Sequence, residues 1–181
     1  DLGTQRDAYL NLASALADGV PEQAIEAADR ALEMCRRSGS DYGADTALQN
    51  RAIAFYQLGD WDAVEATLFH HPILDHVADS TDIIVARAEF VARRGDADHA
   101  RRLLAELPRN PADSEDIEER SQMALVQAMI ALDDGDLGRC LDLCLDDQQR
   151  IGLRLGSGGV ETWELALHSA RRLGRADAVA E

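Results

Sequence analysis

The sequence predicts an all-α fold: a right-handed superhelix, or α-α solenoid, of about five helical hairpins, of which the last is incomplete. Glycines recur at intervals of 40, 36, 40 and 39 residues, and such intervals are typical of stacked helical hairpins. Between them, apolar residues follow the three-to-four-residue spacing of helices, and alternating strand-like runs are absent. Hydrophobic residues make up 46% of the 181 residues but aromatics only 4%, so alanine and leucine must form most of the core. The recurring glycines are Gly19, Gly59, Gly95, Gly135 and Gly174.

The first hairpin joins two helices through the turn at Gly19. Its first helix is expected from about residue 4 to residue 18, and its second begins at Pro21, because proline suits the first turn of a helix. Arg36 and Arg37 lie in the last turn of the second helix, where the helix dipole favours positive charge. The inner stripe of the first helix is expected to be formed by Ala8, Leu12, Ala15 and Leu16.

The second and third hairpins share a Gly-Asp turn, at residues 59–60 and 95–96. Glycine ends helices well and aspartate caps the start of helices, so each aspartate is expected to begin a second helix. Residues 70–72, His-His-Pro, end the second hairpin, and the proline-rich segment 108–113 forms a linker after the third. Residues 73–80 are expected to form a short extra turn rather than a loop.

The fourth hairpin is the longest. Its first helix is expected over about residues 115–134, and its second runs from Asp136 to Leu155 at most. Residues 156–159, Gly-Ser-Gly-Gly, predict a flexible break before a helix that carries Trp163 and ends at Gly174. We expect one repeat domain, 1–181, cut from a longer chain, with repeats at about 4–40, 43–80, 81–111, 114–156 and 158–181.

The charge balance favours some partners and disfavours others. The formal net charge is −16 and the sequence pI is near 4.6, so phosphate backbones and anionic lipids are repelled. Direct nucleic-acid binding by this segment and binding to membranes are therefore not expected, and a neutral or basic partner is favoured. A transmembrane helix is not expected either, because the sequence has no run of about 18 apolar residues. All 18 basic residues are arginine, which indicates a GC-rich bacterial genome. Three cysteines within helical patterns indicate reduced thiols in a cytoplasmic protein.

Three clusters contain residue types that could form a chemical site, and packing or solvent exposure explains each of them better. Histidines at 70, 71 and 76 match no metal motif. Cys140 and Cys144 could supply two soft ligands but stand where the repeat requires small residues. Aspartates at 133–136 and 142–147 lack the spacing of a calcium loop. Phosphate-loop, hydrolase and kinase motifs are also missing, so neither an enzyme nor a cofactor or metal site is expected.

The turns and the residues beside them resemble the tetratricopeptide repeat. That family has a Gly-Asp-Tyr turn, which Gly59-Asp60-Trp61 and Gly95-Asp96-Ala97 match best. Five residues past each glycine the chain has a small residue, as close helix crossing requires: Ala24, Val64, Ala100, Cys140 and Val179. Seven residues before each glycine an apolar residue is expected to face inward: Leu12, Ala52, Ala88, Ala128 and Leu167. The repeats exceed the family's usual length of about 34 residues. One apolar family position is polar here: Asn11, Arg51, Arg87 and Gln127.

Long, irregular repeats of this kind are similar to those that follow the ATPase module of large ATP-binding LuxR-type bacterial transcription regulators. This resemblance implies a sensor or protein-docking arm that acts in signal transduction beside a separate DNA-binding domain. The ATPase and helix-turn-helix parts of those regulators have no counterpart in these 181 residues.

The family register places the binding surface on the inside of the curve, along the first helix of each pair. A protein or peptide partner is expected to bind there by protein–protein interaction, because tyrosine, methionine and arginine make adaptable anchors. Two alternatives stay open: a small-molecule (inducer) sensor, and a structural spacer that forms a homodimer. The expected groove residues are Tyr9, Gln49, Tyr56, Glu89, Arg93, Gln122, Met129 and Asp133.

Overall fold

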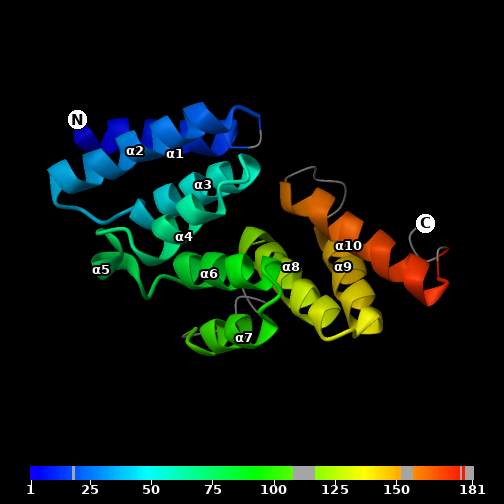
Figure 1. Ribbon diagram of the computed structural model, residues 1–181. Helices are drawn as coiled ribbons and strands as arrows, with labels where there is room; N and C mark the ends of the chain where they lie inside the picture. Colours follow the sequence, from blue (N-terminus) through cyan, green and yellow to red (C-terminus); the bar gives the residue numbers. More distant parts are fainter. Residues whose placement is uncertain (18, 108–116, 152–156, 176, 178–181) are drawn as a thin grey trace. The chain divides into compact units, whose positions relative to one another are not determined.

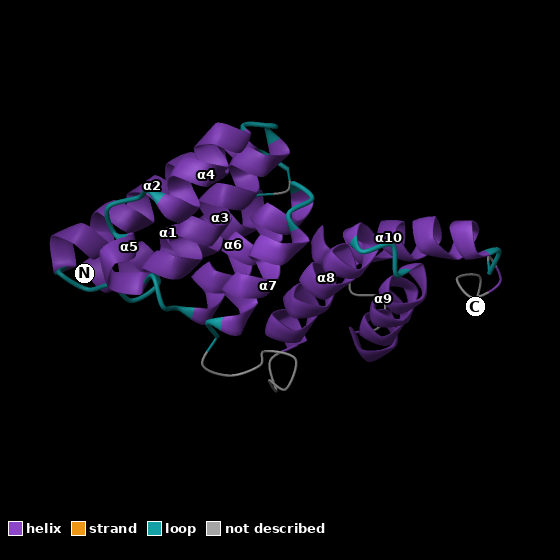
Figure 2. Cartoon of the chain, turned by 60° about the horizontal axis from the view of Figure 1, so that its bottom comes forward, coloured by secondary structure: helices purple, strands orange, loops and turns teal. Residues whose placement is uncertain are grey.

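The computed structural model describes residues 1–17, 19–107, 117–151, 157–175 and 177. Within these ranges the chain forms ten helices and no strand, so the all-α prediction is confirmed (Figure 1, Figure 2). None of the helices in the same ranges combines the length and the apolar character needed to cross a bilayer. The helices are α1 (Leu2–Leu16), α2 (Pro21–Ser38), α3 (Ala44–Gln57), α4 (Trp61–Phe69), α5 (Leu74–Val77), α6 (Thr81–Arg93), α7 (Ala97–Ala105), α8 (Ile117–Asp133), α9 (Leu137–Ile151) and α10 (Ser157–Leu173).

The order of the helices matches the expected hairpins. In the expected pairing, α1, α3, α6, α8 and α10 are first helices and α2, α4, α7 and α9 are second helices. Helices α1 and α2, α3 and α4, and α8 and α9 pack against each other, and a Gly-Asp turn joins α6 to α7. The four-residue helix α5 is the short extra turn expected between residues 73 and 80. The linker at 108–113 and residues 178–181 of the unfinished partner lie outside the described residues.

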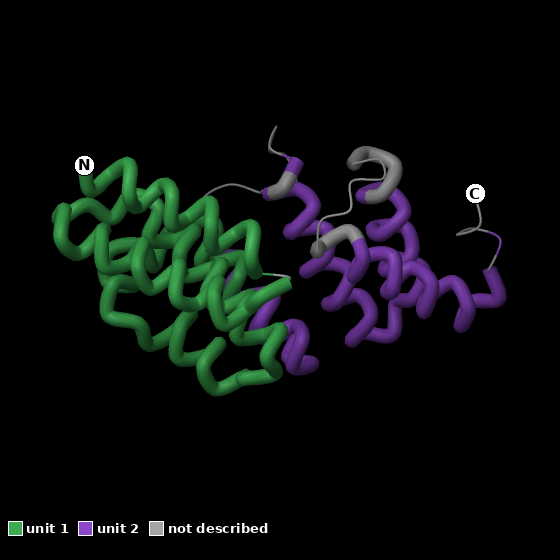
Figure 3. Tube along the Cα trace, turned by 90° about the horizontal axis from the view of Figure 1, so that it is seen from above, with its two compact units in different colours: residues 1–87 green, residues 88–181 purple. Residues whose placement is uncertain are grey.

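The helices belong to two compact units, Asp1–Arg87 and Ala88–Glu181, and the division falls inside α6 (Figure 3). In the first unit α1 packs against α2, α2 against α3, and α3 against α4, while α1 also reaches α3. In the second unit α8, α9 and α10 pack against one another and α7 packs against α8. Each unit thus encloses its own core of alanine, leucine and cysteine side chains.

A Gly-Asp turn with one geometry occurs three times. Its glycine has a φ of +73°, +75° or +76°, which a residue with a Cβ rarely adopts. The glycine N–H and the next N–H donate to carbonyls three and five residues back, as in a Schellman motif. The aspartate carboxylate then accepts the backbone N–H three residues ahead, at 3.0 Å each time. The three turns are Gly59-Asp60, Gly95-Asp96 and Gly135-Asp136.

The first turn is built differently. The Val20 N–H donates to the Leu16 carbonyl oxygen four residues back, at 2.8 Å, rather than five residues back, and α2 begins after Val20 without a side-chain cap. Pro21 occupies the first turn of α2, where its missing N–H costs nothing. The end of α2 is again a glycine, Gly39, whose φ is +64°. Pro21 therefore begins α2, as the sequence predicts, and Gly39 ends it.

The residues expected to be buried beside the turns are buried in the middle of the chain, but two of them, on the outer helices α1 and α10, are exposed. Ala24, Val64, Ala100 and Cys140 are at most 3% exposed, while Val179 lies outside the described residues. Seven residues before the glycine, Ala52, Ala88 and Ala128 are buried, but Leu12 and Leu167 are 45% and 39% exposed. Helix α1 packs against α2 and α3, and α10 packs against α8 and α9, and these contacts leave Leu12 and Leu167 exposed to solvent.

Two local expectations are wrong. Ala13 of α1 and the C-cap residue Ala17 are buried. Three residues of the expected inner stripe, Ala8, Leu12 and Ala15, are exposed instead. The helical period was correct, but which face is buried depends on how α2 and α3 pack against α1. Residues 157–159 form the first turn of α10 rather than a break. Burial further along that helix stabilises it enough to include poor helix formers at its start.

Two of the four polar departures from the repeat pattern, Arg51 and Arg87, bind neighbouring helices within the first unit. Arg51 on α3 donates to Asp29 Oδ1 on α2 at 2.8 Å and also hydrogen-bonds Thr67 on α4. Arg87 on α6 donates to the Leu68 carbonyl oxygen of α4 at 2.7 Å. Both guanidinium groups lie near the C-terminal end of α4, where the helix dipole favours positive charge. Both arginines thereby hold the nine-residue α4 against the helices that carry them.

A substitution at Gly43, the N-cap of α3, would test the contact between α1 and the start of α3. Its φ is +77°, and a Cβ there would lie 2.7 Å from Leu10 Cδ1 of α1. We expect Gly43→Ala to lower the free energy of unfolding by about 1–2 kcal/mol through backbone strain, and by roughly 1 kcal/mol more because Leu10 must leave its packing. Gly59→Ala is the matched control, since φ is +73° and no atom lies within 4 Å of the added Cβ. Equal losses in urea unfolding would contradict the contact with α1.

Candidate protein-binding face

The eight predicted groove residues all lie on first helices of pairs. Tyr9 is on α1, Gln49 and Tyr56 are on α3, and the remaining five are on α6 and α8. The second unit therefore contains the larger group. That group consists of Glu89, Arg93, Gln122, Met129 and Asp133.

Three of these residues meet in one polar cluster, together with a fourth that was not predicted. Arg93 donates to Glu89 Oε1 at 2.7 Å and forms an ion pair with Glu161 of α10. Gln122 Nε2 of α8 donates to Glu89 Oε2 at 3.4 Å. Helices α6, α8 and α10 thus contribute side chains to one place, which we call the Arg93 cluster (Glu89, Arg93, Gln122 and Glu161).

The Arg93 cluster is half-buried. The side chains of Arg93, Glu89 and Glu161 are 13%, 20% and 27% exposed. Burial disfavours the guanidinium charge, but the carboxylates of Glu89 and Glu161 outweigh that effect and raise the pKa of Arg93 above its ordinary value. Two carboxylates face one guanidinium, so the cluster has an excess negative charge and part of each carboxylate still meets solvent.

Glu161 could have been found from the sequence. It lies 13 residues before Gly174, and Gln122 lies 13 residues before Gly135. Extending the register of Gln122 by one repeat therefore points to Glu161. By the same counting from the turn glycines, Glu89 corresponds to Met129, and Arg93 corresponds to Asp133, in the third and fourth pairs.

The other two residues of the second unit lie outside the cluster. Met129 is half-buried on α8. Asp133 is exposed at the end of α8, where its Oδ1 lies 3.6 Å from the position that a Cβ on Gly95 would occupy. Next to it, Asp134 forms an ion pair with Arg101 of α7. This end of α8 thus faces the turn that precedes α7.

The three predicted residues of the first unit engage other parts of that unit. Tyr9 is half-buried and packs against the core cluster that includes Leu48 and Leu74. The ring of Tyr56 meets Trp61 edge to face, with centroids 5.1 Å apart and an interplanar angle of 90°. Gln49 is half-buried. Part of each side chain is thus used in packing within the unit.

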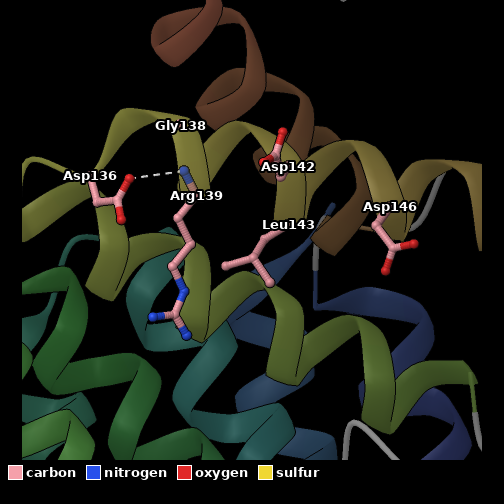
Figure 4. Close-up of a pocket in the computed structure, with 6 residues that line it drawn as sticks. All are labelled: Asp136, Gly138, Arg139, Asp142, Leu143 and Asp146. Atoms are coloured by element: carbon pink, nitrogen blue, oxygen red, sulfur yellow. Dashed lines mark hydrogen bonds between the residues drawn. The ribbon is translucent and has the colours of Figure 1, made fainter.

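A shallow hollow runs along α9 in the second unit (Figure 4). Its lining comes from one helix and the turn before it, and it includes Asp136, Arg139, Asp142 and Asp146. Asp136 is already used as the N-cap of α9, as the dashed line in Figure 4 shows. The hollow is therefore the exposed acidic surface of a helix rather than an enclosed pocket.

The histidines considered for metal binding are spread along the end of α4 and through α5. His70 is exposed, His71 Nδ1 accepts the Ile73 N–H at 3.3 Å, and His76 lies 3.7 Å from Asp41 Oδ2. Across the described ranges, no group of three or more His, Cys, Asp or Glu side chains is arranged to hold a metal ion. Burial, and next the charge of Arg51, lower the pKa of His71.

We expect Arg93→Met to destabilise the second unit by about 1–3 kcal/mol, because Glu89 and Glu161 would be left as uncompensated, half-buried charges. Adding Glu89→Gln and Glu161→Gln should recover part of this loss, as measured by urea unfolding. Arg102→Met, at an exposed position on α7, is the control and should change stability by less than about 0.5 kcal/mol. A triple variant no more stable than Arg93→Met would argue against charge compensation in the cluster.

His71 gives the first unit a pH dependence with a defined sign. Because its pKa is lowered in the folded state, the unfolded chain binds the proton first as the pH falls. Its contribution to stability should therefore be complete above about pH 6.5 and decline below that value. The measurement is the urea midpoint between pH 7.5 and 5.5, which should fall less steeply in His71→Gln than in the exposed-site control His70→Gln. The same slope in both variants would exclude His71 as the cause.

No family model, curated protein or solved structure matches the chain. The function of the face must therefore follow from its own geometry. The Arg93 cluster brings charged and amide groups from three first helices together, with partly exposed carboxylates and without a metal-ligand group among the described residues.

Proposed function

We propose that this chain is a non-catalytic module that binds a protein or peptide on the face carrying the Arg93 cluster. The proposal includes the finer architecture: a right-handed superhelix of tetratricopeptide-like hairpins. Its support is the repeated Gly-Asp turn, which occurs with one geometry at intervals of 36 and 40 residues. Hairpins joined by identical turns stack in similar orientations, and such stacks bind extended partners along their inner helices.

The observation that carries the proposal is the meeting of α6, α8 and α10 at one polar cluster. These are first helices of three successive pairs, and Glu89, Gln122 and Glu161 each come from a different one. A row of successive first helices is the surface that repeat arrays offer to a partner. Side chains already fixed by ion pairs lose little conformational entropy when a partner binds.

The charge of the face favours a basic or neutral segment. One guanidinium does not neutralise the two carboxylates of the cluster, and the whole chain carries a net charge of −16. An arginine or lysine of a partner would compensate the excess charge and could hydrogen-bond the exposed carboxylate oxygens. The same field would speed the approach of a basic partner.

The resemblance to the repeat arms of large ATP-binding LuxR-type regulators supports a setting for this module. In that setting the arm docks a partner in the bacterial cytoplasm and thereby changes the state of neighbouring domains. The cytoplasmic setting also agrees with three free, buried cysteines. Binding rather than chemistry would then be the role of these residues.

An array of random peptides probed with the full 181-residue chain tests the proposal. Bound peptides should be enriched in arginine and lysine, and Glu161→Gln should weaken the best basic peptide by about tenfold, the effect of one lost charged hydrogen bond. Fluorescence anisotropy with that labelled peptide gives the affinities.

Asp142→Asn is the matched control, because it removes the same charge from the exposed surface of α9 in the same unit. It should leave the affinity nearly unchanged. Equal weakening by both variants would show that overall charge, and not the Arg93 cluster, attracts the peptide, and an array without enrichment would remove the proposal altogether.

A further inference from the structure

Helix α10 carries an exposed stripe in which apolar and charged side chains alternate. Val160, Glu164, Leu167 and Arg171 follow one another at steps of four, three and four residues, so they lie on one side of the helix. All four are exposed, and we call them the α10 stripe. The other side of α10 packs against α8 and α9 (Figure 1). Its buried residues are Thr162, Ala166, Ser169 and Ala170.

The apolar members of the stripe differ from the surface of a typical helix in this chain. Val160 is 49% exposed and Leu167 is 39% exposed, whereas every exposed residue of α2 is polar or charged. Single exposed apolar side chains are common on proteins, so this pair alone does not identify a docking surface. The charges of the helix supply the second observation.

Charge is divided between the two halves of α10. Residues 157–164 contain Glu161 and Glu164 and no basic residue. Residues 165–175 contain Arg171, Arg172 and Arg175 and no acidic residue. The helix is therefore negative at its start and positive at its end, although the whole chain carries a net charge of −16. Among the described residues, the side chains of Glu164 and Arg171 have no ion-pair partner.

We propose that the α10 stripe is a self-association surface, on which α10 of a second copy packs antiparallel. Such a contact is isologous, because a two-fold axis brings the same stripe of each copy against the other. With the axis between residues 167 and 168, Glu164 of each copy lies opposite Arg171 of the other. The two Leu167 side chains meet at the centre, and Val160 packs on the aliphatic part of Arg175.

Charge complementarity selects both this occupant and its direction. Antiparallel packing places the acidic half of each helix beside the basic half of the other and forms two Glu164–Arg171 pairs. Parallel packing would place like charges opposite each other at both positions, which disfavours it. A basic peptide of the kind proposed for the Arg93 cluster would meet arginines along half of the helix. The stripe shares no residue with that cluster, so self-association goes beyond the proposed function.

The contact is small, and the expected association is correspondingly weak. One helix from each copy buries less surface than the interfaces of permanent dimers. We expect a dissociation constant of about 10–100 µM. At about 0.15 M salt the Debye length is about 8 Å, so the repulsion between two negatively charged copies is screened more than ion pairs in contact.

Sedimentation velocity of the 181-residue chain, over a concentration range of about 5–500 µM around the expected dissociation constant, tests the proposal. The wild-type chain should shift from monomer to dimer across this range. Glu164→Arg and Arg171→Glu should each weaken dimerisation at least about tenfold, because each replaces two attractive pairs by two repulsive ones. A wild-type chain that stays monomeric at the highest concentration would overturn the proposal.

An equimolar mixture of these two variants tests the antiparallel register. In a heterodimer of Glu164→Arg with Arg171→Glu, each arginine again faces a glutamate, so the mixture should dimerise about as tightly as the wild-type chain. Both positions are exposed, and circular dichroism verifies that each variant is folded. Both variants remain strongly negative, so net charge alone does not attract one to the other. A mixture that associates no better than its components would contradict the register.

Leu12→Glu is the matched control for Leu167→Glu. Both leucines are exposed, at 45% and 39%, and both lie on first helices, but Leu12 is on α1 in the other unit. Leu167→Glu should remove the dimer over the whole concentration range, because it buries a charge at the centre of the contact. Leu12→Glu should leave dimerisation unchanged. Equal losses in the two variants, or a loss in Leu12→Glu alone, would show that α10 is not the surface that associates.

Discussion

The Gly-Asp turn is the local constraint on which the hairpins depend. A helix that ends in a glycine of positive φ leaves the chain pointing back along the helix, and the following aspartate satisfies the first free N–H groups of the next helix. Because Asp60, Asp96 and Asp136 repeat this geometry, α3–α4, α6–α7 and α8–α9 begin from equivalent turns. The small residues five positions later, Val64, Ala100 and Cys140, are buried in all three second helices.

The turns were predictable because each is decided within about six residues of sequence. The buried positions beside them were predictable wherever a helix has neighbours on both sides, as for Ala52 and Ala88. Leu12 and Ala8 were misplaced because the face that α1 buries is set by packing partners, which periodicity alone does not specify. The start of α10 was missed for the same reason, since local preference for a break yields to burial further along the helix.

The candidate site was predictable in part. The repeat register selected Glu89, Arg93 and Gln122, and the structure brings these three together. It did not reveal that they bind one another and Glu161, because ion pairing between helices depends on their spacing in three dimensions. Tyr56 illustrates the converse case: its ring is engaged by Trp61, an interaction that the family register does not encode.

The position of the boundary between the two units determines what a cut between them would break. The boundary falls between Arg87 and Ala88, inside the 13 residues of α6, so this one helix contributes residues to both units. Recombination or proteolysis at that point would sever helical hydrogen bonds in the middle of an element instead of cutting a linker. We therefore expect a cut between Arg87 and Ala88 to disrupt α6 itself and not only to separate the two units.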